Sequence, residues 1–227
     1  MDVQNRFSED YADPDADVYA YEIAMGWRLP EPGAAAPGIA DVLAGIVGDD
    51  LVNRAGHALY KSSNTDLLAF IAAAVSGVSL QYTVRRIAEA AGYEGVLHLS
   101  TDATGFPALS GGACLSLRDL ARFGLLLARR GAGADGSQVG SAAFIEASRS
   151  RPAPPMPAPR DWIRYSNQMF TNGRWIGHAG YGGQFLMVDM ETGTVGAFFS
   201  VLENEAGFDA GYMSDVIRML ERAIGAR

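Results

Sequence analysis

The sequence predicts an α/β protein of the α+β kind, in which helices come first and an antiparallel sheet with a C-terminal helix follows. Two observations predict this class. Apolar residues recur at helical spacing until about residue 130, and after a proline-rich stretch at 151–160 they follow the two-residue period of strands. The turn sequence Glu191-Thr192-Gly193 then separates two strand-like runs, which is typical of an antiparallel hairpin.

Five helices are expected in the first part of the chain, over 18–27, 38–48, 64–77, 79–92 and 116–131. The clearest of them is expected to begin at Asn64 and Thr65, two possible caps, with Asp66 on its first turn and a glycine after its last turn. The last of the five opens with Ser116 and has Asp119 three residues later, which is close to a capping box.

The second part of the chain is expected to be mainly loop and strand. We interpret 131–160 as loop-rich, with RPAPPMPAPR at 151–160 as an extended connector. Three short strands are predicted, over 175–179, 184–190 and 194–202. Both alternate positions of 185–190 are largely apolar, which indicates a strand covered on both faces. Asp209 is expected to cap a helix that faces the sheet through Met213, Val216, Ile217, Leu220 and Ile224.

The composition excludes several kinds of chemistry. Of 18 basic residues only Lys61 is a lysine, so a phosphate-binding GKS/T loop and a Schiff-base lysine elsewhere are ruled out. The net charge of −8 argues against a nucleic-acid partner, whose phosphates would be repelled. The single cysteine, Cys114, cannot form an internal disulfide, and we interpret it as a small buried residue beside a glycine pair.

No metal or cofactor is expected. Besides the single cysteine the candidate ligands are His57, His98 and His178, and neither a CxxC nor an HExxH spacing occurs. We interpret His57 and His98 as structural or surface residues. The first residues lack the basic-then-apolar order of a signal peptide, and there is no run of 18 apolar residues. We therefore expect a cytoplasmic location without a membrane segment, unless a signal peptide was lost with the N-terminus.

The segment that begins at Tyr60 is the first with a chemical interpretation. Tyr60 precedes Lys61, Ser62 and a well-formed helix. A tyrosine hydroxyl near a helix N-terminus lies in positive potential, which favours the phenolate of a general base. The alternative is a core tyrosine followed by an ordinary polar cap.

The second such segment contains His178 and runs WIGHAGYGGQ over 175–184. Four glycines in seven residues at a strand edge let a ligand approach the backbone, and backbone N–H groups there can hold an oxyanion. Glycine-rich hairpins also occur without such a function. Tyr165-Ser166-Asn167 imitates a Tyr-x-Asn motif, but we interpret it as a decoy because it lies just after the proline connector.

Together these segments resemble the serine β-lactamase-like hydrolases, and in particular the branch of 6-aminohexanoate-dimer hydrolases and related esterases. Four segments agree with that branch in order: FSEDYADPDADVYAYEIAMGW, YKSSNTDLLAFIAAAVSG, LSGGACLSLRDLARFGLLLARRG and HAGYGGQFLMVDMETGTV. The resemblance implies a β-lactamase/transpeptidase-like fold. It implies one catalytic-type domain, in which 1–160 is mainly helix and loop and 161–227 holds the strands and the C-terminal helix.

The resemblance also implies roles for individual residues. Tyr60 would be the general acid/base, and Ser62 would contact the substrate amide. His178 stands where many relatives have a lysine, and would hydrogen-bond near the tyrosine or the substrate. The backbone N–H of Tyr181 would be an oxyanion-hole donor. Ala179 replaces the usual hydroxyl residue, which disfavours a β-lactam carboxylate and favours a small amide or ester as substrate.

The family's nucleophile is absent from the sequence. It lies in a Ser-x-x-Lys motif, and no serine here is followed by a lysine at the third position. The nearest form, Ser116-Leu117-Arg118-Asp119, ends in an acid and is a helix cap. We therefore expect a chain that lacks the family's N-terminal part, with its nucleophile helix and first strands.

Three functions follow from this interpretation. The first is a serine hydrolase that acts through an acyl-enzyme and is not competent as these 227 residues alone. The second is a non-catalytic fragment or paralogue that acts as a binding or interaction module. A penicillin-binding-type peptidase is a weaker third. Without the N-terminal part, we expect apolar sheet surface around Phe185, Met187, Phe198 and Val201 to be uncovered, and the chain to oligomerise or aggregate.

Overall fold

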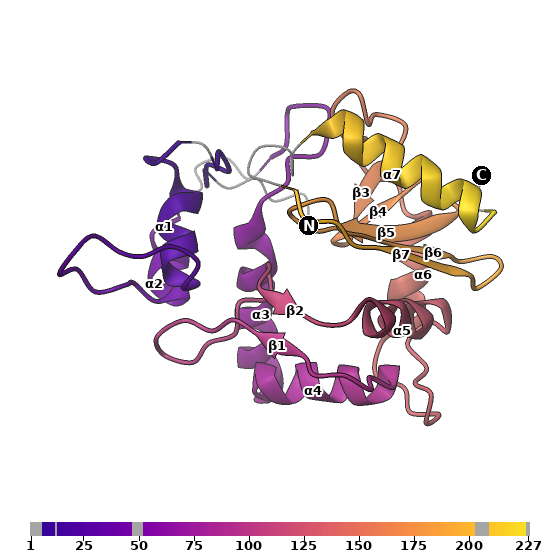
Figure 1. The fold of residues 1–227 in the computed structure, drawn as a ribbon, viewed down its shortest axis with the longest axis horizontal. Helices are drawn as coiled ribbons and strands as arrows, with labels where there is room; N and C mark the ends of the chain where they lie inside the picture. The colour runs from indigo at the N-terminus through magenta and orange to yellow at the C-terminus, as the bar shows by residue number, and fades with distance from the viewer. Residues whose placement is uncertain (1–5, 12, 47–51, 203–208, 226–227) are drawn as a thin grey trace.

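The computed structural model describes residues 6–11, 13–46, 52–202 and 209–225 (Figure 1). Within these residues the elements are, in chain order, α1 (Asp17–Ala24), α2 (Ile39–Ala44), α3 (Ser62–Ser76), α4 (Leu80–Ala91), β1 (His98–Leu99), β2 (Ala113–Cys114), α5 (Leu117–Ala128), α6 (Ala142–Ser150), β3 (Arg164–Ser166), β4 (Met169–Thr171), β5 (Trp175–Ala179), β6 (Phe185–Asp189), β7 (Val195–Phe198) and α7 (Ala210–Ala223). Helices therefore dominate the first half and strands the second, as the change of hydrophobic period predicts.

The main sheet has five antiparallel strands in the order β3-β4-β5-β6-β7, so each strand pairs with its neighbour in sequence. The predicted hairpin is confirmed: Phe185 lies opposite Phe198 and Val188 opposite Val195, across the turn at 191–193. On the other side of β6, Ala179 of β5 lies opposite Phe185. The sheet thus presents the glycine-rich end of β5 beside the start of β6.

Strand β6 is covered on both faces, as its apolar pattern predicts. Figure 1 shows α7 on one side of the sheet and α5 and α6 on the other. Phe185 and Met187 pack in one core with α7 residues, whereas Leu186 and Val188 pack in a second core with residues of α5 and α6. This alternation follows from the two-residue period of a strand. The α7 face contributes Met213, Val216, Ile217 and Leu220, as predicted.

The expected uncovered sheet surface is largely wrong. Phe185 is 1% exposed and Met187 is 0% exposed, because α7 lies across them. Phe198 is partly buried against the same core, and only Val201, at 95%, is exposed as expected. The C-terminal helix supplies the cover.

Helix α3 begins two residues earlier than predicted. Lys61 is its N-cap residue and makes no side-chain cap, so Asn64 and Thr65 lie inside the helix and do not cap it. The carboxylate of Glu9 accepts the Ser62 backbone N–H at 3.1 Å, which satisfies the helix N-terminus from a distant loop. Gly77 ends the helix in the left-handed region, with φ of 67°, as predicted.

Two predicted caps at other helices are confirmed. The Ser116 hydroxyl accepts the Asp119 backbone N–H at 3.1 Å at the start of α5. Asp209 accepts the Tyr212 backbone N–H at 2.9 Å at the start of α7. These caps lie within one helical turn of their partners, which is why the local sequence reveals them.

Helix α6 lies in the region expected to be loop-rich, and the hairpin of β3 and β4 is not among the three predicted strands. Only Ile145 and Ser148 of α6 are buried, so the helix has too narrow an apolar stripe to stand out. Strands β3 and β4 have three residues each, too few for a period to show. The interpretation of Cys114 as buried is also wrong, because this residue lies exposed in β2.

A separate apolar cluster anchors the N-terminal segment. Phe7, Val18, Tyr21, Ile39 and Ala108 are each at most 1% exposed and pack together across α1, α2 and the loop after β1. This cluster fixes the start of loop 7–11 next to α3.

Candidate active site

The structure brings together three of the four predicted site residues. Tyr60 lies just before α3 and His178 lies on β5, with their ring centroids 6.3 Å apart. Ser62 is the first residue of α3, and its hydroxyl lies near enough to the phenol of Tyr60 to lower the pKa of that phenol. Segments more than 100 residues apart in sequence thus converge on one cluster.

Tyr165 completes the aromatic side of this cluster. Its ring centroid is 5.9 Å from that of Tyr60 and 6.1 Å from that of His178. Phe170 of β4 packs on the other side of the histidine, 5.4 Å between centroids. The Tyr165-Ser166-Asn167 string, which we interpret from sequence as a decoy motif, has its tyrosine at the border of the site. The short β3–β4 hairpin places it there.

Burial raises the pKa of Tyr60, and the negative charges of Glu9 and Asp66 raise it further. The nearby Ser62 hydroxyl acts in the opposite direction and lowers the pKa of Tyr60. The expectation that the helix N-terminus favours the phenolate is therefore outweighed by burial. Tyr60 holds its proton at neutral pH and can donate it, but it becomes a base only when a neighbour stabilises the phenolate.

His178 is neutral for a related reason. Burial lowers its pKa, against a smaller opposing contribution from its hydrogen bond to the Ala179 carbonyl. Nδ1 lies 2.7 Å from that carbonyl oxygen, which assigns the proton to Nδ1 because a carbonyl can only accept. Nε2 is then a hydrogen-bond acceptor.

The prediction missed Glu9 and Tyr11, which reach the site from the N-terminal loop. Oε1 of Glu9 accepts the Tyr11 hydroxyl at 2.8 Å and also accepts the Ser62 hydroxyl in a short hydrogen bond. The Tyr11 and Ser62 hydroxyls lie 3.2 Å apart. These residues belong to the FSEDY string of the resemblance, but their spacing of about 50 residues from Ser62 gives no local signal.

Burial is the main reason that the pKa values of Glu9 and Tyr11 are raised. Hydrogen bonds from Ser62 and Tyr11 and the charge of Lys61 partly offset the rise for Glu9. The ammonium group of Lys61 itself donates to the Phe7 carbonyl and so ties loop 7–11 to α3.

Tyr181 lies at the edge of the cluster, in the turn between β5 and β6. Its side chain is 52% exposed, and its ring centroid is 5.6 Å from that of Tyr11. Gly182 and Gly183 follow with φ of 90° and 88°, values that a side chain would strain. The glycines therefore shape a turn that no other residues would fit.

Asp66 supports the cluster from within α3 and does not cap the helix. It is 0% exposed and accepts hydrogen bonds from the Tyr21 hydroxyl, the Ser110 hydroxyl and the Leu109 backbone N–H, the last at 2.6 Å. It thereby joins α3 to α1 and to the loop that follows β1.

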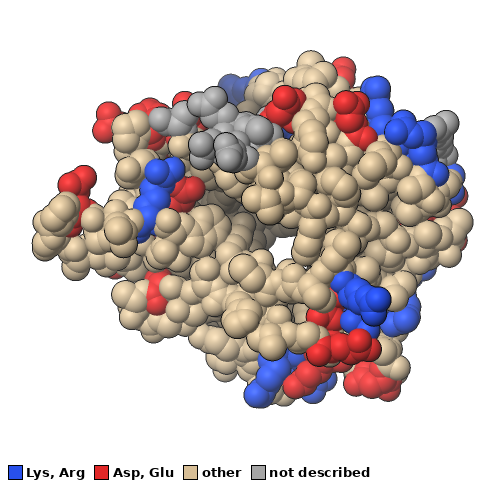
Figure 2. Space-filling view, in the orientation of Figure 1, with Lys and Arg blue, Asp and Glu red and all other residues tan. Residues whose placement is uncertain are grey.

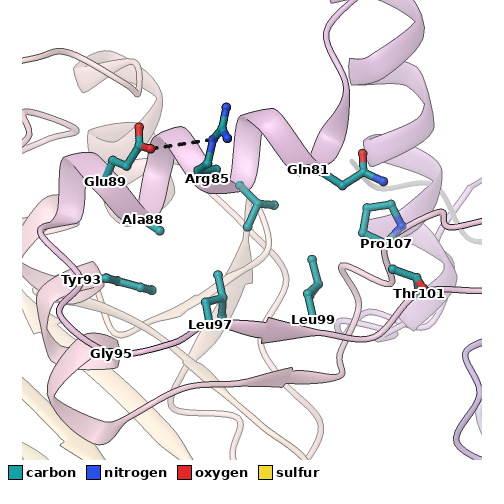
Figure 3. A pocket seen from close by; sticks show the side chains of 11 residues that line it. Gln81, Arg85, Ala88, Glu89, Tyr93, Gly95, Leu97, Leu99, Thr101 and Pro107 are labelled. Carbon is teal, nitrogen blue, oxygen red and sulfur yellow. Dashed lines mark ion pairs between the residues drawn. The ribbon is translucent and has the colours of Figure 1, made fainter.

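A separate cavity of about 510 Å³ lies between α4 and the segment 93–107 (Figure 3). Its walls are mostly apolar, with the Arg85–Glu89 ion pair at 3.8 Å on one side. Its lining contains Gln81, Val84, Arg85, Ala88, Glu89, Tyr93, Gly95, Leu97, Leu99, Thr101 and Pro107. None of the residues of the Tyr60 cluster is among them, so this cavity is not the site assembled above.

Figure 2 shows an opening through the middle of the molecule, while charged side chains of both signs lie mostly toward the periphery. The C-terminal half of α3 has exposed apolar residues, among them Ile71 at 49% and Val75 at 83%. In the described part of the chain no three His, Cys, Asp or Glu side chains gather as a metal site. Nor is any single described helix long and apolar enough to cross a membrane, although the bent pair α3–α4 passes on length and composition.

Comparison with known proteins agrees with the resemblance. Residues 6–215 match the family model described as Beta-lactamase. The chain is 31% identical over 147 residues to the 6-aminohexanoate-dimer hydrolase of Paenarthrobacter ureafaciens, a match that covers 64% of this chain and 36% of that protein.

A solved structure from Bacillus anthracis, of a protein assigned as a 6-aminohexanoate-dimer hydrolase, superposes with a TM-score of 0.77 at 23% identity. The match covers 98% of this chain and 59% of the other. At this identity the likeness shows the fold alone. The chain spans only about a third of the curated relative and about three fifths of the solved one.

Proposed function

The chain belongs to the beta-lactamase family and has its β-lactamase/transpeptidase-like fold, and on this premise we propose that it carries part of the active site of a serine hydrolase. The reaction is cleavage of a small amide or ester through an acyl-enzyme. One observation carries the proposal: the phenol of Tyr60, the hydroxyl of Ser62 and the imidazole of His178 converge from separate segments.

In this proposal Tyr60 exchanges protons with the nucleophile and the leaving group. Its raised pKa suits the acid half of this task, in which the phenol protonates the departing amine or alcohol. The neutral His178 accepts a hydrogen bond through Nε2 from the substrate or from Tyr60. Ser62 contacts the substrate amide, and the backbone N–H of Tyr181 stabilises the oxyanion.

The nucleophile is proposed to come from sequence outside these 227 residues. No Ser-x-x-Lys occurs in them, and the relatives are considerably longer than this chain. The opening in Figure 2 and the exposed apolar end of α3 support this proposal. An apolar helix packed there would remove its own apolar surface and that of α3 from water, which stabilises the folded state.

The proposed substrate class follows the names of the relatives and one residue of the site. A 6-aminohexanoate dimer is a linear amide, and the curated relative is named for its hydrolysis. Ala179 offers no hydroxyl to a substrate carboxylate, which disfavours β-lactams and the peptides cleaved by penicillin-binding-type enzymes. We therefore propose a small linear amide or ester.

An alkyl fluorophosphonate, which labels activated serines, tests the proposal. The 227-residue chain should not be labelled, whereas a longer chain that includes the in-frame upstream sequence should be labelled at one serine. In that longer chain Tyr60→Phe should slow labelling by about 100-fold, within the usual contribution of a general acid or base, while Tyr82→Phe, at an exposed tyrosine of α4, should not.

Two results would oppose this proposal. Stoichiometric labelling of the 227-residue chain would show that the nucleophile lies within it. The lack of labelling in the longer chain, or upstream sequence without a Ser-x-x-Lys, would favour the alternative of a non-catalytic binding module.

A further inference from the structure

The β3–β4 hairpin turns through two residues that both have positive φ, 49° at Asn167 and 64° at Gln168. A two-residue hairpin loop of this kind favours asparagine first and glycine second, because glycine has no steric penalty in the left-handed region. Gln168 therefore stands where glycine would fit best. A strained residue other than glycine points to a use for its side chain.

The Gln168 side chain links this hairpin to helix α3. Its amide oxygen accepts the Tyr165 hydroxyl at 2.9 Å and the Thr65 hydroxyl at 3.2 Å. An amide oxygen has two lone pairs, so this one group can hold both hydroxyls. Tyr165 belongs to the same hairpin, whereas Thr65 lies 103 positions earlier, near the start of α3. Gln168 thus ties the phenol of Tyr165 to the helix.

Tyr165 contacts the three other rings of the candidate site. Its ring centroid is 5.9 Å from that of Tyr60, 6.1 Å from that of His178 and 5.2 Å from that of Phe170. It meets Tyr60 and His178 edge-on, at 75° and 63°, an arrangement that aromatic rings favour. Because the Tyr165 hydroxyl donates to Gln168, the place of this ring depends on the residue at position 168.

We propose that Gln168 is a positioning residue, which holds the Tyr165 ring against Tyr60 and His178 and so shields one side of the imidazole from water. The shielding keeps the imidazole neutral, with Nε2 free to accept a hydrogen bond. The functional meaning rests on the proposed role of His178 as such an acceptor. The geometric claim about Gln168 and Tyr165 does not depend on that role.

The pKa of His178 reports on this shielding, because burial lowers it. The side chains that neighbouring elements place beside the imidazole are two phenols and two apolar groups: Tyr60, Tyr165, Phe170 and Leu186. The charge of Glu9 acts on the two phenols and raises their pKa values. Gln168 is uncharged, so replacing it by another neutral residue removes no charge from the site.

The experiment follows the pH titration of His178 by NMR, in the full 227-residue chain with isotope-labelled histidine. The sequence has two other histidines, His57 and His98, which serve as references within every sample. A change confined to His178 then separates a local effect from a general change of the protein.

The pKa of His178 is measured in four backgrounds: unchanged, Gln168→Gly, Tyr165→Phe and both together. Asn167→Gly is the matched control. It relaxes the positive φ of the neighbouring turn residue, whose amide donates to Ser148 of α6 at 3.4 Å. The control therefore changes the same turn and leaves the hydrogen bonds of Gln168 in place.

Gln168→Gly should raise the pKa of His178 by about 0.5 unit or more, because water reaches the imidazole once the Tyr165 ring is released. The midpoint of thermal unfolding should move by less than about 5 °C, since relief of the left-handed backbone offsets the lost hydrogen bonds. In the Tyr165→Phe background the same change should shift the pKa by less than half as much. Asn167→Gly should leave it unchanged.

Three results would overturn the proposal. They are an unchanged pKa of His178 in Gln168→Gly, an equal shift in the Tyr165→Phe background, and an equal shift in Asn167→Gly. The first denies the shielding, the second denies the route through the Tyr165 hydroxyl, and the third assigns the effect to the turn as a whole.

Thr65→Val provides a second test in case the glycine variant does not fold. Valine has nearly the shape of threonine, so the change leaves the hairpin intact and removes only the contact of Gln168 with α3. The pKa of His178 should rise by about 0.3 unit, and an unchanged value contradicts an anchor on α3. Neither measurement needs turnover or a nucleophile, so a failure here differs from a failure of fluorophosphonate labelling.

Discussion

Along α3 the first turn and the last two turns differ in what they bury. At the N-terminal end Ser63 and Asp66 are 0% exposed and Ser62 is 5% exposed, whereas near the C-terminal end Ile71 is 49% and Val75 is 83% exposed. Buried polar groups cost free energy unless they are hydrogen-bonded. The described partners of Ser62 and Asp66 provide those hydrogen bonds, so the N-terminal end is held by polar contacts from α1, loop 7–11 and the loop after β1.

The C-terminal end of α3 shows the opposite situation. A helix that is apolar around its whole circumference is usually buried, and here it faces solvent. This agrees with the proposal that further sequence packs against the opening in Figure 2. The difference shows that α3 is held by polar contacts at its N-terminal end, next to the site, whereas its C-terminal end exposes apolar side chains to solvent. Four substitutions test this contrast.

The largest effect is expected for Asp66→Ala at the buried end. The change leaves Tyr21, Ser110 and the Leu109 N–H without their acceptor, which should lower the free energy of unfolding by about 3–5 kcal/mol. Urea unfolding followed by circular dichroism measures it. Tyr21→Phe, which removes one of these partners, should cost only about 1 kcal/mol. Equal costs for the two variants would contradict the central role of Asp66.

Gly77→Ala tests the point at which α3 ends. No atom lies within 4 Å of the added Cβ, so the cost is the left-handed backbone alone, with φ of 67°, and should be about 1 kcal/mol. The same unfolding measurement detects it. Gly77→Asn should cost less because asparagine tolerates this region. An alanine variant as stable as the parent would mean that the helix end rearranges freely.

Glu9→Gln should change how stability depends on pH, by less than about 1 kcal/mol because the half-buried carboxyl is partly screened. The pKa of Glu9 is raised above the ordinary 4.5 by burial, so the folded state binds this proton more tightly than the unfolded state. The parent therefore loses stability as pH rises from about 4.5 through the raised pKa, and the variant does not.

Chemical unfolding at a series of pH values measures that difference. The two proteins should be closest in stability below pH 4.5 and diverge above it in favour of the variant. If the stability advantage of the variant became smaller as pH rises, the folded state would bind the Glu9 proton less tightly than the unfolded state. That result would contradict a pKa raised by burial.

The smallest effect is expected for Ile71→Ser at the exposed end, within about 0.5 kcal/mol. The buried counterpart Ile176→Ser, at 1% exposure in β5, should cost at least about 3 kcal/mol. Ile71→Ser should also reduce the binding of an apolar dye to the chain. A large loss of stability at position 71 would mean that this end of α3 is already covered.

The sequence alone determined the features that arise within a few residues of each other. The helix caps at Ser116 and Asp209, the stop at Gly77 and the β6–β7 hairpin follow from local spacing, because a cap or turn satisfies backbone groups within one turn of the chain. The four ordered motifs also identified the family, and the roles of Tyr60, Ser62, His178 and Tyr181 remain proposals built on it.

Only the tertiary structure decided the environment of those residues. Glu9 reaches Ser62 across 53 positions and replaces the predicted cap at Asn64, while Asp66 turns inward to Tyr21 and Tyr165 joins the cluster through two strands of three residues. Such contacts depend on which distant surfaces meet when the chain closes. Hydrophobic period and capping patterns describe one element at a time, so they carry no information about the partner that each element will face.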